Sequence, residues 1–353
     1  MSDSDRDEQR ADTQAADHAM AARRPPTSAD VARRAGVSRA TVSYVLNDLP
    51  HSRVSEETRA RVRAAAAELG YTPHAMARSL RAGHSDIVLL PQIALPTGPM
   101  VTGFYEGLAA QLGALGYTFI VHLDPSTRGV EAARVWASLR PAGLLVEAER
   151  VTRRSIELLR IAGTRAIMVL SEAPSRLAPT LVINEDDVGA CAAAHLIARG
   201  HRHLVAVVPR EVALLRLGIE RLSGIKRVAC PHGLTVERAD LAYDEADAAR
   251  LAAHWKEARP PMGVFTYNDE YGMLLMRALL DAGFAIPGDI ALVGADNLPL
   301  CALLRPRLTS VHKGDAAAIG SVVETFHTLI QGQTIDLAAI PLFRPSIVVR
   351  ESA

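Results

Sequence analysis

The chain has little cysteine, no long apolar run and no excess of charge of either sign. Its three cysteines, Cys191, Cys230 and Cys301, stand far apart and form neither a CxxC pair nor a metal-ligand spacing. Isolated thiols in odd number fit a reducing compartment better than a disulfide framework. No stretch approaches the ~18 to 20 uninterrupted apolar residues of a membrane helix. The N-terminus also lacks the basic and then apolar pattern of a secretory signal, so we expect a cytoplasmic protein without a membrane role.

Motifs of catalysis are missing as well. The sequence contains no P-loop, no GxGxxG after a predicted strand, no GxSxG and no metal-ligand spacing. Its twelve histidines are scattered. His201 and His203 fall in a predicted helix-to-strand turn, where they are better suited to satisfying backbone groups than to catalysis. We therefore expect no enzyme, no cofactor and no metal. The alternative of a cytoplasmic enzyme would require turnover of a bound ligand.

The net charge of zero hides an uneven distribution. Residues 21–84 hold eleven arginines against five carboxylates, a balance of +6, whereas residues 1–20 are at −4. A basic module beside a near-neutral remainder is typical of a protein that binds nucleic-acid phosphates. A solvated charged helix face is the alternative, and it explains less well why the arginines coincide with the next motif.

Residues 27–47, TSADVARRAGVSRATVSYVLN, predict two short helices around a glycine turn. Thr27 and Asp30 suit the start of the first helix, as a cap and its capping-box partner. Gly36 suits the turn because it accepts a positive φ at little cost, and Ser38 suits the start of the second helix. A helix, a short glycine turn and a second helix make the DNA-binding helix-turn-helix.

The sequence around this motif predicts four regions. Residues 1–24 are polar, acidic and aperiodic, and we expect a disordered tail there. Residues 25–72 form the headpiece, which includes a third helix that ends near Leu69. Residues 73–85 contain a pattern of only about two helical turns, which is marginal alone in water. This region is either a hinge helix that needs a partner or a plain linker, and residues 86–353 form the core.

Short apolar runs alternate with amphipathic helices throughout the core, which is typical of a parallel α/β fold. The expected strands are Ile87–Pro91, Thr118–His122, Gly143–Glu147, Ala166–Leu170, Leu204–Val208, Val236–Ala239, Gly263–Thr266, Ile290–Val293 and Ser346–Arg350. The expected helices are 103–115, 130–139, 153–162, 188–199, 213–229, 245–258, 271–282 and 316–330. Two such series predict two doubly wound lobes with a ligand cleft at their strand ends. We place the lobes at about 86–183 plus 312–331 and about 184–298 plus 343–350.

Several segments resemble the lactose/galactose repressor (LacI–GalR) family, and the resemblance covers residues 27–350. They are DVARRAGVSRATVSYVLN, RVSEETRARVRAAAAELGYTPHAMARSLR, ARGHRHLVAVV, ERLSGI, FTYNDEYGMLLMRALLDAGFAIPGDIALVGADN and RPRLTSV. The resemblance implies an all-α helix-turn-helix headpiece followed by a core of two doubly wound lobes, similar to a periplasmic sugar-binding protein. It implies a transcriptional regulator, most simply a repressor, that binds a palindromic operator in double-stranded DNA as a homodimer under control of a small, sugar-like effector.

In the headpiece, the resemblance places Arg39, Ala40 and Tyr44 at base-reading positions in the major groove. Arg39 can pair bidentately with a guanine edge, which is worth about 1–3 kcal/mol of discrimination. A phosphate contact or free solvation is its alternative. Many relatives have arginine at the position of Tyr44, so base preference there is open. The positions that match DNA-backbone ligands are Ser38, Thr41, Ser43, Asn47, Arg53 and Thr58, although capping alone would also explain Ser38.

In the region 73–85, Ala77, Arg78 and Leu80 match the residues that enter the minor groove at the operator centre. Leu80 would act there as an apolar wedge that bends the duplex, and packing against the core is its alternative. Pairing of two such hinge helices requires a dimer.

In the core, Arg221, Asn268 and Asp296 match the polar effector ligands of the second lobe. An arginine, an amide and a carboxylate together can bind neighbouring hydroxyls, whereas Asn268 and Asp296 could also be caps of strand-to-helix turns. The first lobe departs from the family, because Leu170-Ser171 stands where an acid is common, and Asn184 replaces a usual aspartate. The identity of the effector is therefore open. A sugar-binding transport or sensor protein shares the bilobed core but would lack the headpiece.

Overall fold

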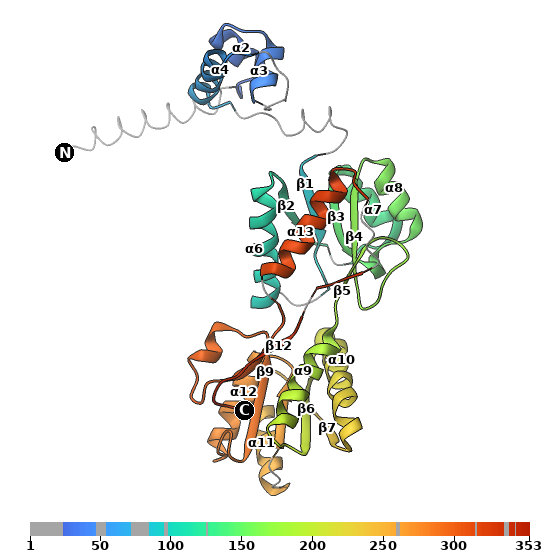
Figure 1. The fold of residues 1–353 in the computed structure, drawn as a ribbon, viewed down its shortest axis with the longest axis vertical. Helices are drawn as coiled ribbons and strands as arrows, with labels where there is room; N and C mark the ends of the chain where they lie inside the picture. Colours follow the sequence, from blue (N-terminus) through green and yellow to red (C-terminus); the bar gives the residue numbers. More distant parts are fainter. Residues whose placement is uncertain are drawn as a thin grey trace, which may run out of the picture. The chain divides into compact units, whose positions relative to one another are not determined.

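The chain divides into two compact units, Met1–Ala82 and Gly83–Ala353, in the computed structural model (Figure 1). The structure describes residues 24–46, 54–71, 85–94, 98–124, 126–258, 262–314, 316–334, 339–342 and 344–353. In these ranges the first unit consists of helices, and the second contains two sheets of six strands each.

The described part of the first unit contains three short helices, α2 (Ser28–Ala35), α3 (Arg39–Leu46) and α4 (Glu56–Leu69). Each presents one apolar stripe to the other two, as expected of helices that are stable only when packed together. The resulting core consists of small aliphatic side chains: Val31, Ala32, Ala35, Val42, Val45, Val62, Ala65 and Ala66.

Local capping fixes where the first two of these helices begin and end. The Asp30 carboxylate accepts hydrogen bonds from the Thr27 backbone nitrogen (2.9 Å) and hydroxyl (2.6 Å), and these bonds lower the pKa of Asp30. Gly36 ends α2 with a φ of 66°. Ser38 Oγ then accepts a hydrogen bond from the Thr41 backbone nitrogen at 3.1 Å, which starts α3. The helix-turn-helix predicted from the sequence is present.

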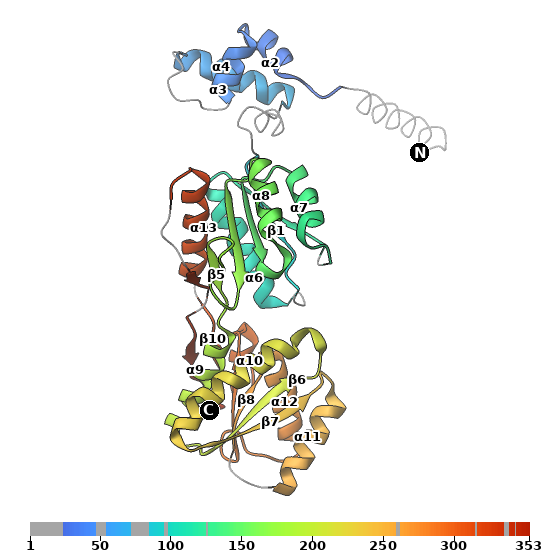
Figure 2. The ribbon, with the colours of Figure 1, turned by 90° about the vertical axis from the view of Figure 1, so that its right-hand side faces the viewer.

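The first lobe of the second unit is a parallel sheet in the order β11-β5-β4-β3-β1-β2. Its strands are β1 (Ile87–Pro91), β2 (Thr118–His122), β3 (Gly143–Glu147), β4 (Ala166–Ser171), β5 (Thr180–Val182) and β11 (Ala339–Pro341). Helices cover both faces of this sheet (Figures 1 and 2), with α6 (Pro99–Ala114) and α13 (Ala316–Ile330) on one face and α7 (Gly129–Ser138) and α8 (Arg153–Ile161) on the other.

The second lobe has the strand order β12-β10-β9-β8-β6-β7, in which only β12 runs antiparallel to its neighbour. Its strands are β6 (His203–Pro209), β7 (Thr235–Leu241), β8 (Met262–Thr266), β9 (Ile290–Ala295), β10 (Thr309–His312) and β12 (Ser346–Val348). One face is covered by α9 (Glu185–Ala198) and α10 (Val212–Ala229), and the other by α11 (Glu245–Ala258) and α12 (Asp269–Asp281).

The chain passes between the lobes three times. It leaves the first lobe after β5 and enters α9, returns from β10 to α13, and leaves again from β11 to β12. Each lobe is therefore completed by strands distant in sequence, and the first residues of α9 and the residues after β10 lie at the lobe boundary.

Most elements lie where the sequence predicts them, and β1, β2, β3, α11 and α13 have the expected bounds. Two predicted helix starts are wrong by three or more residues. Helix α6 begins four residues early, because Pro99 can occupy a first-turn position. Helix α9 begins at Glu185 rather than Val188, and its first turn contains three acidic residues, which the helix dipole favours. The strands β5, β10 and β11 were not predicted from the sequence.

Candidate functional site

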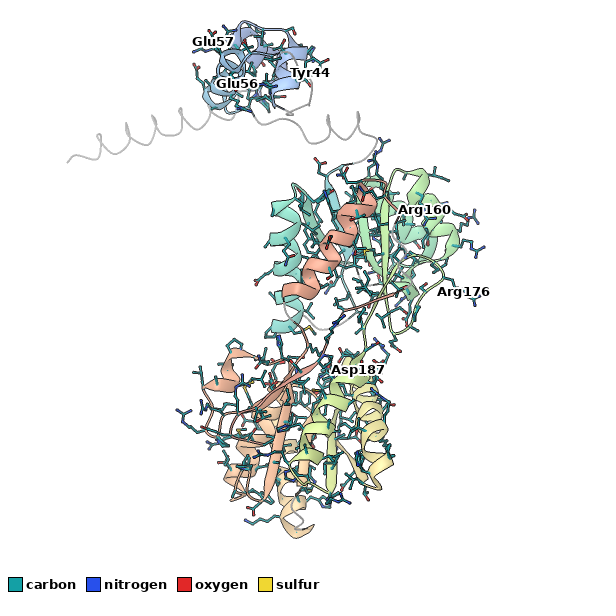
Figure 3. The ribbon with its side chains drawn as sticks, viewed as in Figure 1. Tyr44, Glu56, Glu57, Arg160, Arg176 and Asp187 are labelled. Carbon is teal, nitrogen blue, oxygen red and sulfur yellow. The ribbon has the colours of Figure 1, made fainter. Side chains whose placement is uncertain are left out.

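The outer side of α3 carries the three residues expected to read bases. Arg39, Ala40 and Tyr44 are all exposed, and 46% of the Tyr44 surface is accessible. Tyr44 lies on the side of α3 opposite its buried valines (Figure 3). Arg39 makes no ion pair with another described residue, whereas Arg33 and Arg34 are paired with Asp30 and Glu68. The exposed side of α3 thus presents, at the start of the helix, a cation that no described carboxylate pairs.

The expected backbone ligands are only partly described. Ser38 Oγ lies 2.9 Å from Thr41 Oγ1 while it caps α3, so both hydroxyls have local partners. Ser43 is half-buried. Thr58 lies in the first turn of α4, where its backbone nitrogen donates to Ser55 Oγ at 3.3 Å. Asn47 and Arg53, and the hinge residues Ala77, Arg78 and Leu80, lie outside the described residues.

The second lobe contains a buried charge cluster formed by Arg221, Glu185, Lys313 and Asp296. Arg221 is 2% exposed and lies on α10, and Glu185 is 3% exposed and starts α9. Glu185 Oε2 accepts hydrogen bonds from Arg221 Nε at 2.7 Å and lies 2.6 Å from Arg221 Nη2. Burial would raise the pKa of Glu185, but the charges of Arg221 and Lys313 outweigh it and hold that pKa at about 2.

Lys313 extends this cluster from the crossing between the lobes. Its Nζ donates to Glu185 Oε1 at 2.9 Å and forms an ion pair with Asp296 Oδ1 at 3.3 Å. Asp296 Oδ1 is buried and has no hydrogen-bond partner of good geometry in the described structure, so the ion pair with Lys313 is its main compensation. Asp296 also has a φ of 95°, a strained conformation for a residue with a side chain.

Two glycines allow α9 and α10 to approach closely enough to form the cluster. A Cβ added at Gly189 would lie 1.9 Å from the carbonyl oxygen of Arg221, and one added at Gly224 would lie 1.7 Å from that of Asp186. Only glycine permits such an approach between backbones. The contact between these two helices thus places Arg221 directly beside Glu185.

Tyr267 and Asn268 form the adjoining turn between β8 and α12. Arg221 Nη1 donates to the Tyr267 carbonyl, and the guanidinium lies 4.4 Å from the Tyr267 ring centre. Asn268 caps α12, because its Oδ1 accepts a hydrogen bond from the Tyr271 nitrogen at 3.0 Å, while its Nδ2 donates to Glu270. Asn268 therefore acts as the cap of α12. Asp296, in contrast, caps no α-helix.

Close to Asp296 lies a further buried carboxylate, Asp269. It accepts hydrogen bonds from Ser310 Oγ at 2.6 Å and from the Leu298 nitrogen at 2.7 Å. Burial nevertheless raises the pKa of Asp269 to about 6, with the nearby charge of Asp296 adding to the effect. The loops that follow β8 and β9 are thus tied together by polar contacts on the cleft side of the sheet.

A cavity of about 400 Å³ lies between the two lobes. This volume is within the usual range for small-molecule sites. Its lining is Ile93, Ala94, Met100, Val101, Phe104, Glu147, Ala148, Glu149, Leu170, Ser171, Glu172, Ala173, Ile183, Glu185, Ala213, Arg216, Leu217 and Leu342. Glu185 belongs both to this lining and to the buried charge cluster. Arg221, Asn268 and Asp296 do not line the cavity. Glu185, which connects Arg221 and, through Lys313, Asp296 to the cavity, was not predicted from the sequence.

The first-lobe departures noted in the sequence also lie at the cavity. Leu170 and Ser171 line it, and the acid that follows them, Glu172, forms an ion pair with Arg216 of the second lobe. Arg216 also pairs with Glu220 one turn along α10, at 2.7 Å. Asn184 lies immediately before Glu185, and its amide donates to Asp187 at 3.4 Å.

Comparisons with known proteins agree with this architecture. Residues 27–74 match the model of bacterial regulatory proteins of the lacI family, and residues 193–353 match a periplasmic binding protein-like domain. The chain is 30% identical over 298 residues to the HTH-type transcriptional repressor PurR of Vibrio atlanticus (strain LGP32), covering 81% of this chain and 86% of the relative.

Two solved structures have the same fold. One is the lac repressor dimer bound to operator and the anti-inducer ONPF, with a TM-score of 0.73 and 24% identity, covering 93% of this chain and 99% of that one. The other is the transcriptional regulator CelR–cellobiose complex, with a TM-score of 0.59 and 24% identity, covering 93% and 100%.

A helix-turn-helix headpiece joined to two parallel α/β lobes of the periplasmic-binding-protein type defines a ligand-responsive transcriptional regulator. More specifically, the chain belongs to the LacI family and is a DNA-binding repressor regulated by a small-molecule effector. This family is non-enzymatic, so the chain is not an enzyme. In the described ranges, no helix is long and apolar enough to cross a membrane.

Proposed function

We propose that the chain acts in the cytoplasm as a homodimer that represses transcription from a palindromic operator. Arg39, Ala40 and Tyr44 read bases in the major groove, and Ser38, Thr41, Ser43, Asn47, Arg53 and Thr58 contact the DNA backbone. Ala77, Arg78 and Leu80 act at the minor groove. The observation that carries this proposal is the exposed side of α3, where Arg39 has no ion-pair partner among the described residues.

The proposed domains are an acidic tail at 1–24, the headpiece at 25–72, a hinge at 73–85 and an effector-binding and dimerisation core at 86–353. Arg221, Asn268 and Asp296 bind the effector together with the cavity between the lobes. A sugar-like effector is supported by the cellobiose in the CelR complex and by the mixture of apolar side chains and carboxylates that lines this cavity. Closure of the lobes on the effector changes the equilibrium between two arrangements of the core, which alters operator affinity.

The test is selection of DNA sites from a random duplex library with the full chain, followed by titration of the best site. We expect a palindromic consensus and a loss of about 1–3 kcal/mol in Arg39→Ala, confined to one base position in each half-site. Arg160→Ala is the matched control, because it removes the same charge from an exposed site on α8 of the core (Figure 3). An equal loss in both variants, or a weakening that does not depend on sequence, would contradict base reading by Arg39.

A further inference from the structure

The buried charge cluster is electrically balanced without any ligand. It contains two cations, Arg221 and Lys313, and two carboxylates, Glu185 and Asp296, whose side chains are at most 10% exposed. Glu185 binds both cations at once, through one oxygen each. Both oxygens of Glu185 therefore occupy the positions that an anionic ligand would need beside Arg221 and Lys313.

The described residues that line the cavity add no free cation. Its charged side chains are Glu147, Glu149, Glu172, Glu185 and Arg216. Arg216 is already shared between Glu172 and Glu220. Glu147 is half-buried and accepts a hydrogen bond from the Ala94 nitrogen at 3.1 Å. The described lining therefore has an excess of negative charge.

Building on the proposed effector-binding role of this cleft, we propose that Glu185 determines the chemical class of the effector. The cleft takes an uncharged, hydroxyl-rich ligand and rejects its phosphorylated or carboxylated counterparts. A buried anion needs a cation or several donors to replace its water, and Glu185, which lines the cavity, is already paired with both cations of the buried charge cluster. A phosphate group would either displace the Glu185 carboxylate, leaving that charge buried and unpaired, or lie unpaired itself.

An uncharged polyol avoids both costs. Its hydroxyls can donate to the carboxylates of Glu147 and Glu185, since ionised carboxylates only accept hydrogen bonds. Its less polar face can pack on the apolar side of the cavity, which Phe104, Met100 and Val101 line. The lining thus supplies acceptors and apolar surface, which is what a free sugar needs.

The test measures whether inorganic phosphate stabilises the full chain before and after removal of the Glu185 charge. Glu185→Gln keeps the shape of the side chain and leaves the cluster with one unbalanced positive charge. We expect no change in the thermal midpoint of the wild type with phosphate at millimolar concentration. In the variant we expect a rise of roughly 2–4 °C at about ten times the phosphate dissociation constant. Glucose and glucose 6-phosphate are compared in the same way, and the phosphate ester should stabilise only the variant.

The double variant Glu185→Gln, Arg221→Gln is the matched control, because it restores the charge balance and should lose the response to phosphate. It also separates specific binding from general stabilisation by a kosmotropic anion. If Glu185→Gln does not fold, the same measurements are made on Asp296→Asn. This substitution also leaves the cluster with one unbalanced positive charge, and it removes fewer hydrogen bonds.

A rise in the thermal midpoint of the wild type with phosphate or glucose 6-phosphate overturns the proposal. So does a Glu185→Gln or Asp296→Asn variant that folds but shows no rise in its thermal midpoint with phosphate. These measurements involve the core and no DNA. A failure of operator binding by the headpiece would therefore leave their result unaffected, and the two proposals can fail separately.

Discussion

Among the described residues, each lobe buries one arginine, and the two arginines have partners of opposite kinds. Arg150 of the first lobe is 1% exposed and donates to the carbonyl oxygens of Gln92 (3.1 Å) and Thr127 (3.0 Å). Its guanidinium also lies 5.2 Å from the Trp136 ring centre. Arg221 of the second lobe is bound by a carboxylate. Burial lowers the pKa of Arg150, whereas for Arg221 the charge of Glu185 outweighs burial and raises the pKa.

The difference in their partners gives the two arginines different roles: Arg150 holds loops together, and Arg221 takes part in selecting the ligand. Arg150 ties together the loops that follow β1 and β2, and carbonyl acceptors are sufficient for that purpose. Arg221 is paired with Glu185, which lines the cavity, and its positive charge would attract an anion there if Glu185 did not neutralise it. Two lobes of the same architecture thus use the same residue type, and the partner of each arginine decides its role.

Removal of the two arginines should give the largest effects. Arg221→Met leaves the carboxylates of a buried charge cluster uncompensated and should lower the free energy of unfolding by about 3–5 kcal/mol. Arg150→Met leaves unpaired carbonyls but no orphaned charge, and should cost about 1.5–3 kcal/mol. Urea denaturation of both variants measures the difference. Equal losses would mean that the carboxylate partner adds nothing to the contribution of Arg221.

Lowering the pH should change the stability loss caused by Arg221→Met but not the loss caused by Arg150→Met. The pKa of Glu185 is about 2 in the folded protein, below its ordinary value of 4.5. Its ion pair therefore contributes fully above pH 4.5 and is lost as pH falls toward 2. The cost of Arg221→Met should shrink over this window by up to about 3 kcal/mol. The cost of Arg150→Met should stay constant, because carbonyls do not titrate. Denaturation at about pH 7, 4.5 and 3 checks this, and parallel pH dependence of the two variants would be evidence against it.

The glycines that position Arg221 should give a smaller effect. Gly224→Ala places a methyl group against the Asp186 carbonyl and should cost about 1–3 kcal/mol through separation of α9 and α10. Gly113→Ala in α6 is the first-lobe control. Nothing lies within 4 Å of its added Cβ, so the helix should gain roughly 0.5–1 kcal/mol. Thermal midpoints report both, and a neutral Gly224→Ala would show that the close helix contact is not needed.

The sequence predicts the strands best where they are five residues long and contain a continuous apolar run, both inside the sheet (β1 and β3) and at its edge (β2). The strands β1 and β3 are continuous apolar runs flanked by turns, and this pattern has few other solutions in an α/β protein. The missed strands β5, β10 and β11 have three or four residues each. Their conformation is set by neighbouring strands, so no periodicity within such short segments can reveal them.

The residues of the site could likewise be predicted only in part from the sequence. Resemblance to a family identifies Arg221, Asn268 and Asp296, but not the charges that surround them. Glu185 and Lys313 are 128 positions apart in sequence and meet only because both lie where the chain crosses between the lobes. The one available signal was the acidic run after Asn184, which marks the true start of α9. Carboxylates at a helix start are common, however, and only the folded structure shows that this one faces two buried cations.

The three passages of the chain between the lobes have a consequence for synthesis. Phe326 of α13 packs closely on Gly143 of β3, because a Cβ added at Gly143 would lie 3.0 Å from the Phe326 ring. A ribosome that has released only the strands β1 to β5 has therefore delivered a sheet that still lacks α13 on one face and β11 at one edge. The first lobe keeps one face and one edge of its sheet exposed until nearly the whole second lobe has been synthesised. The two lobes therefore complete their folding together rather than one after the other.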